Sequence, residues 1–585
     1  MLLWFLVALP LCAGVALLVT RAPHTVAVMA AVATAVLAVV AAVARPAASV
    51  AFLDGISFGL AVDGLSAAMV VTVAVVLVAV LVFATGEPGL DHRFHGLMLV
   101  FAAAMLVTVT ATTLVTLLMA WEVMGAASYA LIGYWWREPR RVRSGLVAFL
   151  TTRAADLGLY LAAGAALAGG AHGLDLTRLP DLPDGWRDLA TAGLVVAALG
   201  KSAQLPFSFW LSRAMDGPSP VSAFLHSATM VAAGAYLLLR TEPLLGATPW
   251  AAVVVAWAGA ATALLLGAVA VVQRDLKQLL AASTCAQVGF MVFAAGTAGA
   301  SAGTAHLVAH ALTKSLLFLC AGAWLTAVGT RDLDELRGVA GRHRVTGVAF
   351  TAGALTLAGI PPLSLWATKD RVLTGALTAS LPLYLVGLAA AALSAAYAGR
   401  ALALVWTPST TDRTRVPPAQ QAVLLPLAAG ALVIGVLPGF RPDSGWWEPV
   451  VSGALALLVT GATVAAVRRR DLTAPAPLLH WLGLENLART VVVRPTLATA
   501  RHLARFDDRA VAGTVHATAR IGATVARLVD RRVEWSIDGA VRLVTHGFRT
   551  LGRLARRPQT GRLHHYYAQA VVALAALAAL LLLIR

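Results

Sequence analysis

Long apolar runs alternate with short polar connections along the whole of this 585-residue chain. A typical run holds about 18 to 25 residues, enough for a helix to cross a hydrocarbon core of roughly 30 Å. We count about sixteen such runs, so the pattern predicts an all-α polytopic membrane protein with about sixteen transmembrane helices. The predicted spans cover residues 1–20, 25–44, 63–85, 94–111, 113–135, 145–169, 189–211, 221–239, 251–272, 276–296, 305–328, 346–374, 381–404, 419–437, 450–467 and 567–584.

The connection between the last two predicted spans has a different pattern. Apolar residues recur there at helical spacing, as at Leu497, Ala500, Leu503 and Ala504, and arginines occupy the other faces. This predicts a long amphipathic helix along the membrane surface over residues 471–563, followed by a terminal anchor at 564–585. A helical tail in the cytoplasm is the alternative, but a segment anchored at both ends must stay near the membrane.

Composition agrees with a membrane location, because 59% of the residues are hydrophobic and only 12% are charged. The opening run has no basic segment before it and no convincing cleavage site, so we expect a retained span and not a signal peptide. The net charge is +17, concentrated in the amphipathic connection. Beside a bilayer, such a segment indicates anionic lipid or neighbouring subunits as partners and no nucleic acid.

Arginine-rich loops predict the orientation of the chain. They follow the fifth, eleventh, thirteenth and fifteenth spans, which all end on one side of the membrane. By the positive-inside rule that side is cytoplasmic, which places the N-terminus outside. Loops 175–188 and 441–448, expected on the other side, are more acidic. The loop arginines are Arg137, Arg140, Arg141, Arg143, Arg337, Arg342, Arg344, Arg413, Arg415, Arg468, Arg469 and Arg470.

Lysine is rare in this chain, with only Lys201, Lys277, Lys314 and Lys369 among 45 basic residues. Each lies within or at the edge of an apolar run. Arginine supplies a fixed charge equally well, whereas a desolvated lysine can lose its proton near neutral pH. The four lysines therefore indicate a membrane protein that moves protons.

Two of these lysines accompany proline-broken spans. Lys201 lies five residues before Pro206, and Lys369 with Asp370 follows Pro361 and Pro362. Proline opens a helix, and broken helices inside membranes typically line ion-binding cavities. The repetition about 160 residues apart suggests internally repeated halves, each with its own ion site.

A further stripe of titratable residues is predicted on one helix. His306, His310 and Lys314 follow one another at i,i+4 spacing, about 6 Å apart along a helix axis. Water molecules could bridge such steps for proton hopping. Lys277 lies near a membrane edge, where an ordinary interfacial anchor is the alternative to a proton site.

Other ionisable residues in the spans are more ambiguous. Glu122 lies deep among apolar residues, where it either belongs to a pathway or accepts a hydrogen bond from a neighbouring helix. His226 is equally open to a structural or a functional interpretation. Arg153 and Asp156 stand at i,i+3 and are best interpreted as a structural ion pair. Asp63 is expected to cap a helix.

The sequence offers no site for a redox cofactor. Cys12, Cys285 and Cys320 are scattered singly in apolar runs and could not ligate an iron–sulfur cluster or form a disulfide framework. Phosphate-binding and dinucleotide-binding fingerprints are absent from the sequence. Redox chemistry, if coupled to this chain, must belong to partner subunits.

Several strings resemble the antiporter-like subunits of respiratory complex I, most closely the group called subunit L or chain 5. They are the segments around Trp121 and Glu122, GKSAQLPFSFW from Gly200, MDGPSPVSAFLHSATMV from Met215, DLKQLLAAST from Asp275, HLVAHALTKSLLFL from His306, TKD from Thr368 and the QTGRLHHYY string near the C-terminus. The match covers nearly the whole chain. A departure is Arg371, where the family usually has an acid.

The resemblance implies two inverted five-helix repeats with broken helices and a lateral helix that clamps neighbouring subunits. The implied divisions are 1–90 (N-terminal helices), 91–245 and 246–405 (the two repeats), 406–470 (C-terminal helices), 471–563 (lateral segment) and 564–585 (terminal anchor). NAD, FMN, iron–sulfur clusters and quinone would reside on partner subunits, and none would bind this chain.

The resemblance also implies a proton path. Glu122 and Lys201 would form the central charged pair of the first half, with His226 leading inward. Lys277, His306, His310, Lys314, Lys369 and Asp370 would continue the polar axis through the second half. The expected function is proton translocation in an NADH:quinone oxidoreductase of a bacterial cell membrane. A multisubunit Na⁺/H⁺ antiporter, a membrane hydrogenase, an inorganic-carbon uptake complex and a structural scaffold without a proton path are the alternatives.

Overall fold

The computed structural model describes the whole chain except residues 54, 409–414, 438–444, 446, 470–474 and 585. Two of the loop arginines, Arg413 and Arg470, and most of the acidic loop 441–448 lie outside the described residues. The chain divides into two units, Met1–Leu487 and Ala488–Arg585. The first unit contains the polar residues of interest, and the second begins within the basic connection.

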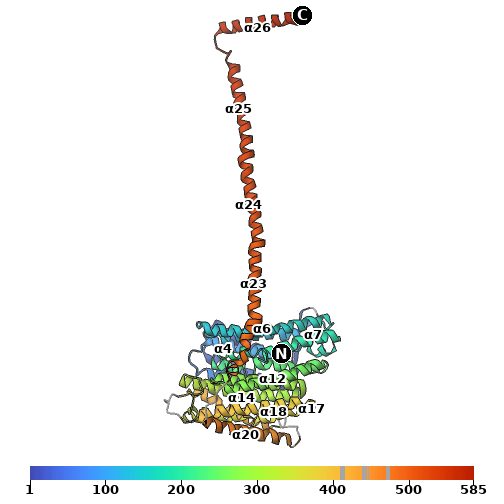
Figure 1. Cartoon of the computed structure of the whole chain (residues 1–585), viewed down its shortest axis with the longest axis vertical. Coiled ribbons are helices and arrows are strands. Elements are labelled where there is room, and N and C mark those ends of the chain that lie inside the picture. Colours follow the sequence, from blue (N-terminus) through green and yellow to red (C-terminus); the bar gives the residue numbers. More distant parts are fainter. Residues whose placement is uncertain (54, 409–414, 438–444, 446, 470–474, 585) are drawn as a thin grey trace. The chain divides into compact units, whose positions relative to one another are not determined.

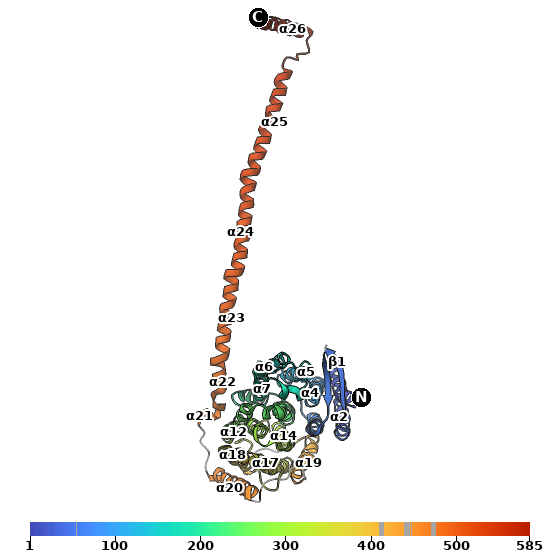
Figure 2. The same ribbon diagram turned by 90° about the vertical axis from the view of Figure 1, so that its right-hand side faces the viewer.

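Thirteen helices in the described part of the chain are long and apolar enough to cross a membrane. This agrees with the predicted all-α polytopic class. Within the first unit, Figure 1 shows α6, α12, α14 and α18 with roughly parallel axes, and Figure 2 views them nearly end on. The thirteen are α1 (Leu2–Val19), α2 (His24–Ala44), α3 (Gly64–Ala84), α4 (His92–Thr110), α5 (Leu114–Ile132), α6 (Pro139–Ala168), the pair α9 and α10 (Ser219–Leu225 and Met230–Arg240), α12 (Pro249–Val272), α13 (Leu276–Thr297), α14 (Gly299–Val328), α18 (Leu381–Trp406), α20 (Trp447–Arg469) and α26 (Leu563–Leu583).

The three remaining predicted spans are formed by shorter helices. Span 189–211 divides into α7 (Asp184–Lys201) and α8 (Phe209–Ala214), and span 346–374 divides into α16 (Arg344–Ala358) and α17 (Ser364–Ala379). Span 419–437 is α19 (Pro418–Val433) with one turn of 3₁₀ helix after it. Both predicted proline breaks are therefore confirmed, and each contains a cis X–Pro bond, Leu205–Pro206 and Pro361–Pro362.

A two-stranded antiparallel hairpin, β1 (Ala47–Leu53) paired with β2 (Ile56–Ala61), was not predicted. It joins α2 to α3. The sequence carried a signal for it, because an Asp-Gly pair stands between two short apolar segments there, and Gly55 adopts a positive φ of 75°. Asp63, directly after the hairpin, caps α3 as predicted, in a reciprocal capping box with Ser66.

Helices α6 and α7 pack backbone to backbone, which sets the position of the first broken helix. A Cβ atom added to Gly158 of α6 would lie only 2.3 Å from the carbonyl oxygen of Gly193 in α7. The absence of a side chain therefore lets the two helices approach closely enough for their polar residues to meet.

Gly158→Ala is accordingly expected to destabilise the protein by about 1–3 kcal/mol, because overpacking forces backbone shifts. Gly164→Ala is the matched control on the same helix, since a Cβ there would meet no atom within 4 Å. It is expected to be neutral or slightly stabilising. Thermal unfolding of the purified complex in detergent measures both. Equal melting temperatures for the two variants would contradict the close-packing argument.

The second unit ends in α26, which follows the non-helical residues 557–562, and the part before them is mainly one long helical rod. It comprises α23 (Arg494–Phe506), α24 (Gly513–Leu528) and α25 (Trp535–Arg556), joined by π-helical turns at Asp507–Ala512 and Val529–Glu534. The predicted helix of the basic connection is thus present, although it is interrupted by π turns that the sequence pattern did not indicate. Its apolar side chains, such as Leu503 and Phe548, are exposed in the isolated chain.

Candidate functional site

Eight of the nine residues predicted to carry chemistry are almost completely buried in the first unit. Their exposed fractions range from 0% to 4%, and they come from α7, α13, α14, α17 and the break between α9 and α10. Buried titratable groups are costly inside a membrane protein and usually mark ion pathways. The eight are Lys201, His226, Lys277, His306, His310, Lys314, Lys369 and Asp370.

The first broken helix presents a buried ion pair. Lys201 is the last residue of α7, and its Nζ lies 3.0 Å from Oδ2 of Asp156 in α6. The other carboxylate oxygen of Asp156 accepts a 2.7 Å hydrogen bond from Nε1 of Trp121, and the Lys201 ammonium lies 5.0 Å from the Trp121 ring centroid. Cations are favoured at a helix C-terminus, so the end of α7 also stabilises the charged lysine.

These contacts correct two expected pairings. Asp156 pairs with Lys201 rather than with Arg153, and Arg153 pairs with Glu122, which also accepts a 2.9 Å hydrogen bond from Tyr160. Glu122 is not deeply buried, because 30% of its side chain is exposed. Adjacent residues on a helix point about 100° apart, so α5 directs Trp121 to Asp156 and turns Glu122 toward the periphery.

His226 lies at a third helix break, which the sequence pattern did not indicate. It follows the last residue of α9, and α10 begins four residues later at Met230. Both of its ring nitrogens are buried without a hydrogen-bond partner in the described structure. Next to it, the hydroxyls of Ser227 and Ser315 lie 2.6 Å apart and connect this break to α14. The break thus places an unpartnered imidazole one residue from this contact with α14.

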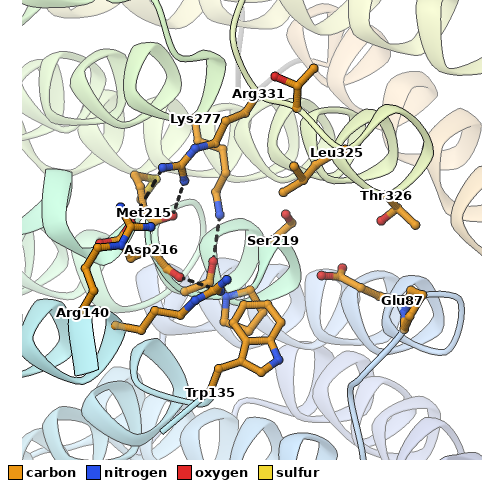
Figure 3. Close-up of a pocket in the computed structure, with 16 residues that line it drawn as sticks. Glu87, Trp135, Arg140, Met215, Asp216, Ser219, Lys277, Leu325, Thr326 and Arg331 are labelled. Atoms are coloured by element: carbon orange, nitrogen blue, oxygen red, sulfur yellow. Dashed lines mark hydrogen bonds and ion pairs between the residues drawn. The ribbon is translucent and has the colours of Figure 1, made fainter. Parts of the chain in front are cut away.

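Lys277 is the second residue of α13 and is 2% exposed, which does not fit an ordinary interfacial anchor. Its Nζ donates a 2.9 Å hydrogen bond to the carbonyl oxygen of Gly217. Figure 3 shows this ammonium group directed into a cavity. The volume of the cavity is about 520 Å³. Lys277 is therefore a buried group with access to a cavity that has room for several water molecules.

The predicted stripe on α14 is present, and each of its members meets a different environment. Nδ1 of His306 lies 3.0 Å from Oγ1 of Thr368, whereas both ring nitrogens of His310 lack a partner in the described structure. Nζ of Lys314 donates to the carbonyl oxygen of Leu280 at 3.0 Å and to the Ser283 hydroxyl. A lysine held only by neutral acceptors can lose its proton more easily than one held by a carboxylate.

Lys369 is likewise held by neutral groups. Its Nζ donates to the carbonyl oxygen of Leu357 at 2.9 Å and to the hydroxyl of Ser394 at 2.8 Å. Ser394 and Tyr397 of α18 form a hydrogen-bonded cluster with Gln287 of α13. Sequence reasoning missed this cluster, although polar residues at i,i+3 in an otherwise apolar helix were a usable signal.

Oδ1 of Asp370, the next residue after Lys369, accepts a 3.0 Å hydrogen bond from Ser452 of α20. The described residues contain no group of three or more His, Cys, Asp or Glu side chains placed to hold a metal ion. The arrangement is a series of separate titratable groups, spread from α6 and α7 through α14 to α17. Proline-broken helices and buried lysines in this order define a polytopic membrane protein of the ion-translocating class.

Comparison with known proteins agrees with this class. Residues 111–394 match the family described as "NADH:quinone oxidoreductase/Mrp antiporter, TM". The chain is 33% identical over 570 residues to NADH-quinone oxidoreductase subunit L of Mycobacterium tuberculosis, covering 91% of this chain and 87% of that protein. The chain therefore belongs to the family of antiporter-like membrane proteins that includes subunit L of NADH-quinone oxidoreductase.

Other relatives match over a shorter length. The chain is 37% identical over 364 residues to NAD(P)H-quinone oxidoreductase chain 5 of Picosynechococcus and spans about half of that protein's length, 55%. Among solved structures, the Mrp complex of Dietzia matches with a TM-score of 0.68 and 25% identity over 95% of this chain and 63% of that chain. Respiratory complex I of Thermus thermophilus matches in fold, with a TM-score of 0.69 at 24% identity over 78% of this chain and 100% of that chain.

Proposed function

We propose that this chain is a proton-translocating subunit of an NADH:quinone oxidoreductase in a bacterial cell membrane. The observation that carries the proposal is the burial of four lysines and three histidines, in a chain that uses arginine at its other basic positions. A buried lysine can release its proton, and arginine cannot. The similarity along most of the mycobacterial subunit L supports the choice of complex.

The proton path would start at the Lys201–Asp156 pair. While the pair is closed, the aspartate stabilises the ammonium form of Lys201; when it loosens, burial alone favours the neutral amine and the proton leaves. It would pass by way of His226 and Lys277 to the stripe on α14. Lys369 and Asp370, beside the second break, would release it. Glu122 would take part through Arg153, since its carboxylate does not contact Lys201.

The surroundings of the path are part of the same proposal. Residues 91–245 and 246–405 would form the two inverted repeats, between N-terminal helices 1–90 and C-terminal helices 406–470. Segment 471–563 would lie along the membrane against neighbouring antiporter-like subunits, with residues 564–585 as its anchor. The N-terminus would lie outside the cell. NAD, FMN, iron–sulfur clusters and quinone would be held by partner subunits.

The test uses the assembled complex in membrane vesicles. Lys201→Ala and Lys369→Ala are each expected to lower the number of protons moved per NADH oxidised, because each removes a buried protonatable group beside a helix break. A pH-sensitive dye measures proton movement, and absorbance measures NADH oxidation. An unchanged ratio in both variants would refute the proposed path.

Exchange of sodium for protons is the second candidate function, and the similarity to the Mrp complex favours it. Sodium-dependent proton flux in vesicles that receive no NADH would indicate this function. A scaffold without a proton path predicts instead that both lysine variants assemble and pump normally.

A further inference from the structure

One cavity of the first unit opens at the ends of several helices and is lined by charged residues. It has a volume of about 520 Å³, which leaves space for a cluster of water molecules. Its walls come from the segments after α3, α5 and α8, from the starts of α6, α9 and α13, and from the end of α14 with the segment after it. Two of the lining residues, Arg140 and Arg141, belong to a loop that is predicted to be cytoplasmic. The cavity therefore lies among several connections on the arginine-rich side.

Most cations around this cavity already have an acidic partner. Arg140 lies 3.2 Å from Asp216, and Arg331 lies 2.5 Å from Asp275 and 3.8 Å from Asp216. Arg141 is paired with Glu138 at 2.6 Å. The paired rim holds the entrance together, and its charges largely neutralise one another.

Glu87 and Lys277 differ from this rim. Oε2 of Glu87 is buried and has no hydrogen-bond partner in the described structure, although the carboxylate lines the cavity. Figure 3 shows the Glu87 carboxyl and the Lys277 ammonium directed into the same space from different sides, with Ser219 between them in this view. Among the residues that the structure describes, Lys277 donates only to a neutral carbonyl oxygen, that of Gly217, and neither group forms a close ion pair.

We propose that Glu87 is the proton-accepting residue of this cavity and that it delivers protons from water on the arginine-rich side to Lys277. A hydronium ion in the cavity protonates the Glu87 carboxylate and leaves as water. The carboxyl O–H bond then breaks, and the proton passes through cavity water to the neutral amine of Lys277, which restores the carboxylate. The inference rests on the proposed proton-translocating function and adds a second entry site to it, which joins the proposed path at Lys277 and not at the Lys201–Asp156 pair.

The carboxyl group of Glu87, in the connection after α3, has a pKa that suits proton transfer near neutral pH. Burial raises the pKa of its carboxyl to about 7, against the opposing effects of the Lys277 charge and a hydrogen bond from the Ser219 backbone N–H. A carboxyl group with this pKa is about half protonated at pH 7, so it can both accept and release a proton. The charged groups that line the cavity around it are Lys277, Arg140, Arg141, Asp216 and Arg331.

The experiment compares Glu87→Gln with the wild-type complex in NADH-driven proton pumping between pH 6 and pH 8.5. Glutamine keeps the size and the acceptor for Ser219 but cannot bind and release a proton. Pumping at pH 7 is expected to fall about tenfold or more. The wild-type rate should decline as pH rises through 7, because the protonated fraction of Glu87 falls, and this dependence should be absent from the variant.

Two further variants make the result decisive. Glu87→Asp keeps a carboxyl group and should restore part of the rate together with a pH dependence, which a merely structural role would not do. Glu335→Gln, in the exposed connection after α14, is the matched control and should pump as the wild type does. If Glu87→Gln pumps normally across this pH range while Lys201→Ala does not, the entry site is refuted and the proposed function stands. If neither variant changes pumping, both are refuted.

Discussion

Lys201→Arg is expected to preserve the charge next to Asp156 and still to stop proton transfer through the first half of the protein. The guanidinium group can pair with the carboxylate but does not deprotonate. Loss of an essential acid–base group typically slows proton transfer about 10²- to 10⁴-fold. The variant therefore separates two roles of Lys201, the fixed positive charge and the exchangeable proton.

The measurement is the number of protons pumped per NADH oxidised by the assembled complex in vesicles. Arg213→Lys is the control, because it makes the opposite exchange in the partly exposed ion pair with Glu485. It is expected to leave the ratio unchanged. Normal pumping by Lys201→Arg would show that the charge alone is needed and that no proton leaves this residue.

Removing one member of the Lys201–Asp156 pair is expected to be more damaging than removing both. In Asp156→Asn the buried ammonium loses its counter-charge, and in Lys201→Met the buried carboxylate does. Each single substitution should cost about 3–5 kcal/mol, because the remaining charge is left uncompensated in the interior. The double variant should recover most of this loss, since no buried charge remains.

Thermal unfolding of the detergent-purified complex, together with the yield of assembled complex, measures this double-mutant cycle. Glu122→Gln tests the neighbouring pair with Arg153, whose side chains are 36% and 30% exposed. A partly exposed ion pair contributes less to stability than a buried one, so Glu122→Gln is expected to lower the melting temperature less. Strictly additive losses for Lys201 and Asp156 would show that the two residues do not depend on each other.

Local patterns in the sequence were sufficient for the helices and their breaks. A run of apolar residues needs no knowledge of its neighbours to predict a span, and Pro206 and Pro361 interrupt their helices because proline lacks an N–H group. The stripe of His306, His310 and Lys314 is also local, since it depends only on the 3.6-residue period of one helix. These features agree with the structure.

Local patterns could not predict which charged residues pair with one another. Arg153 and Asp156 stand three residues apart in sequence, yet their partners lie on α5 and α7, and the rotation of α5 turns Glu122 outward. Glu87 belongs to a short connection that contains no recognisable motif. Its burial beside a cavity depends on the ends of several helices that enclose it. The break at His226 has no proline within it, so no local signal indicated it.

The sequence by itself determined the class of protein, the spans, two of the three helix breaks and which residue types are buried in them, because hydrophobic period and proline chemistry act within one segment. Only the tertiary structure decided which charges meet and which face a cavity. Those contacts depend on how neighbouring helices rotate and how closely they approach, as Gly158 allows for α6 and α7. Such distances are set by packing among segments far apart in the chain, and no single segment encodes them.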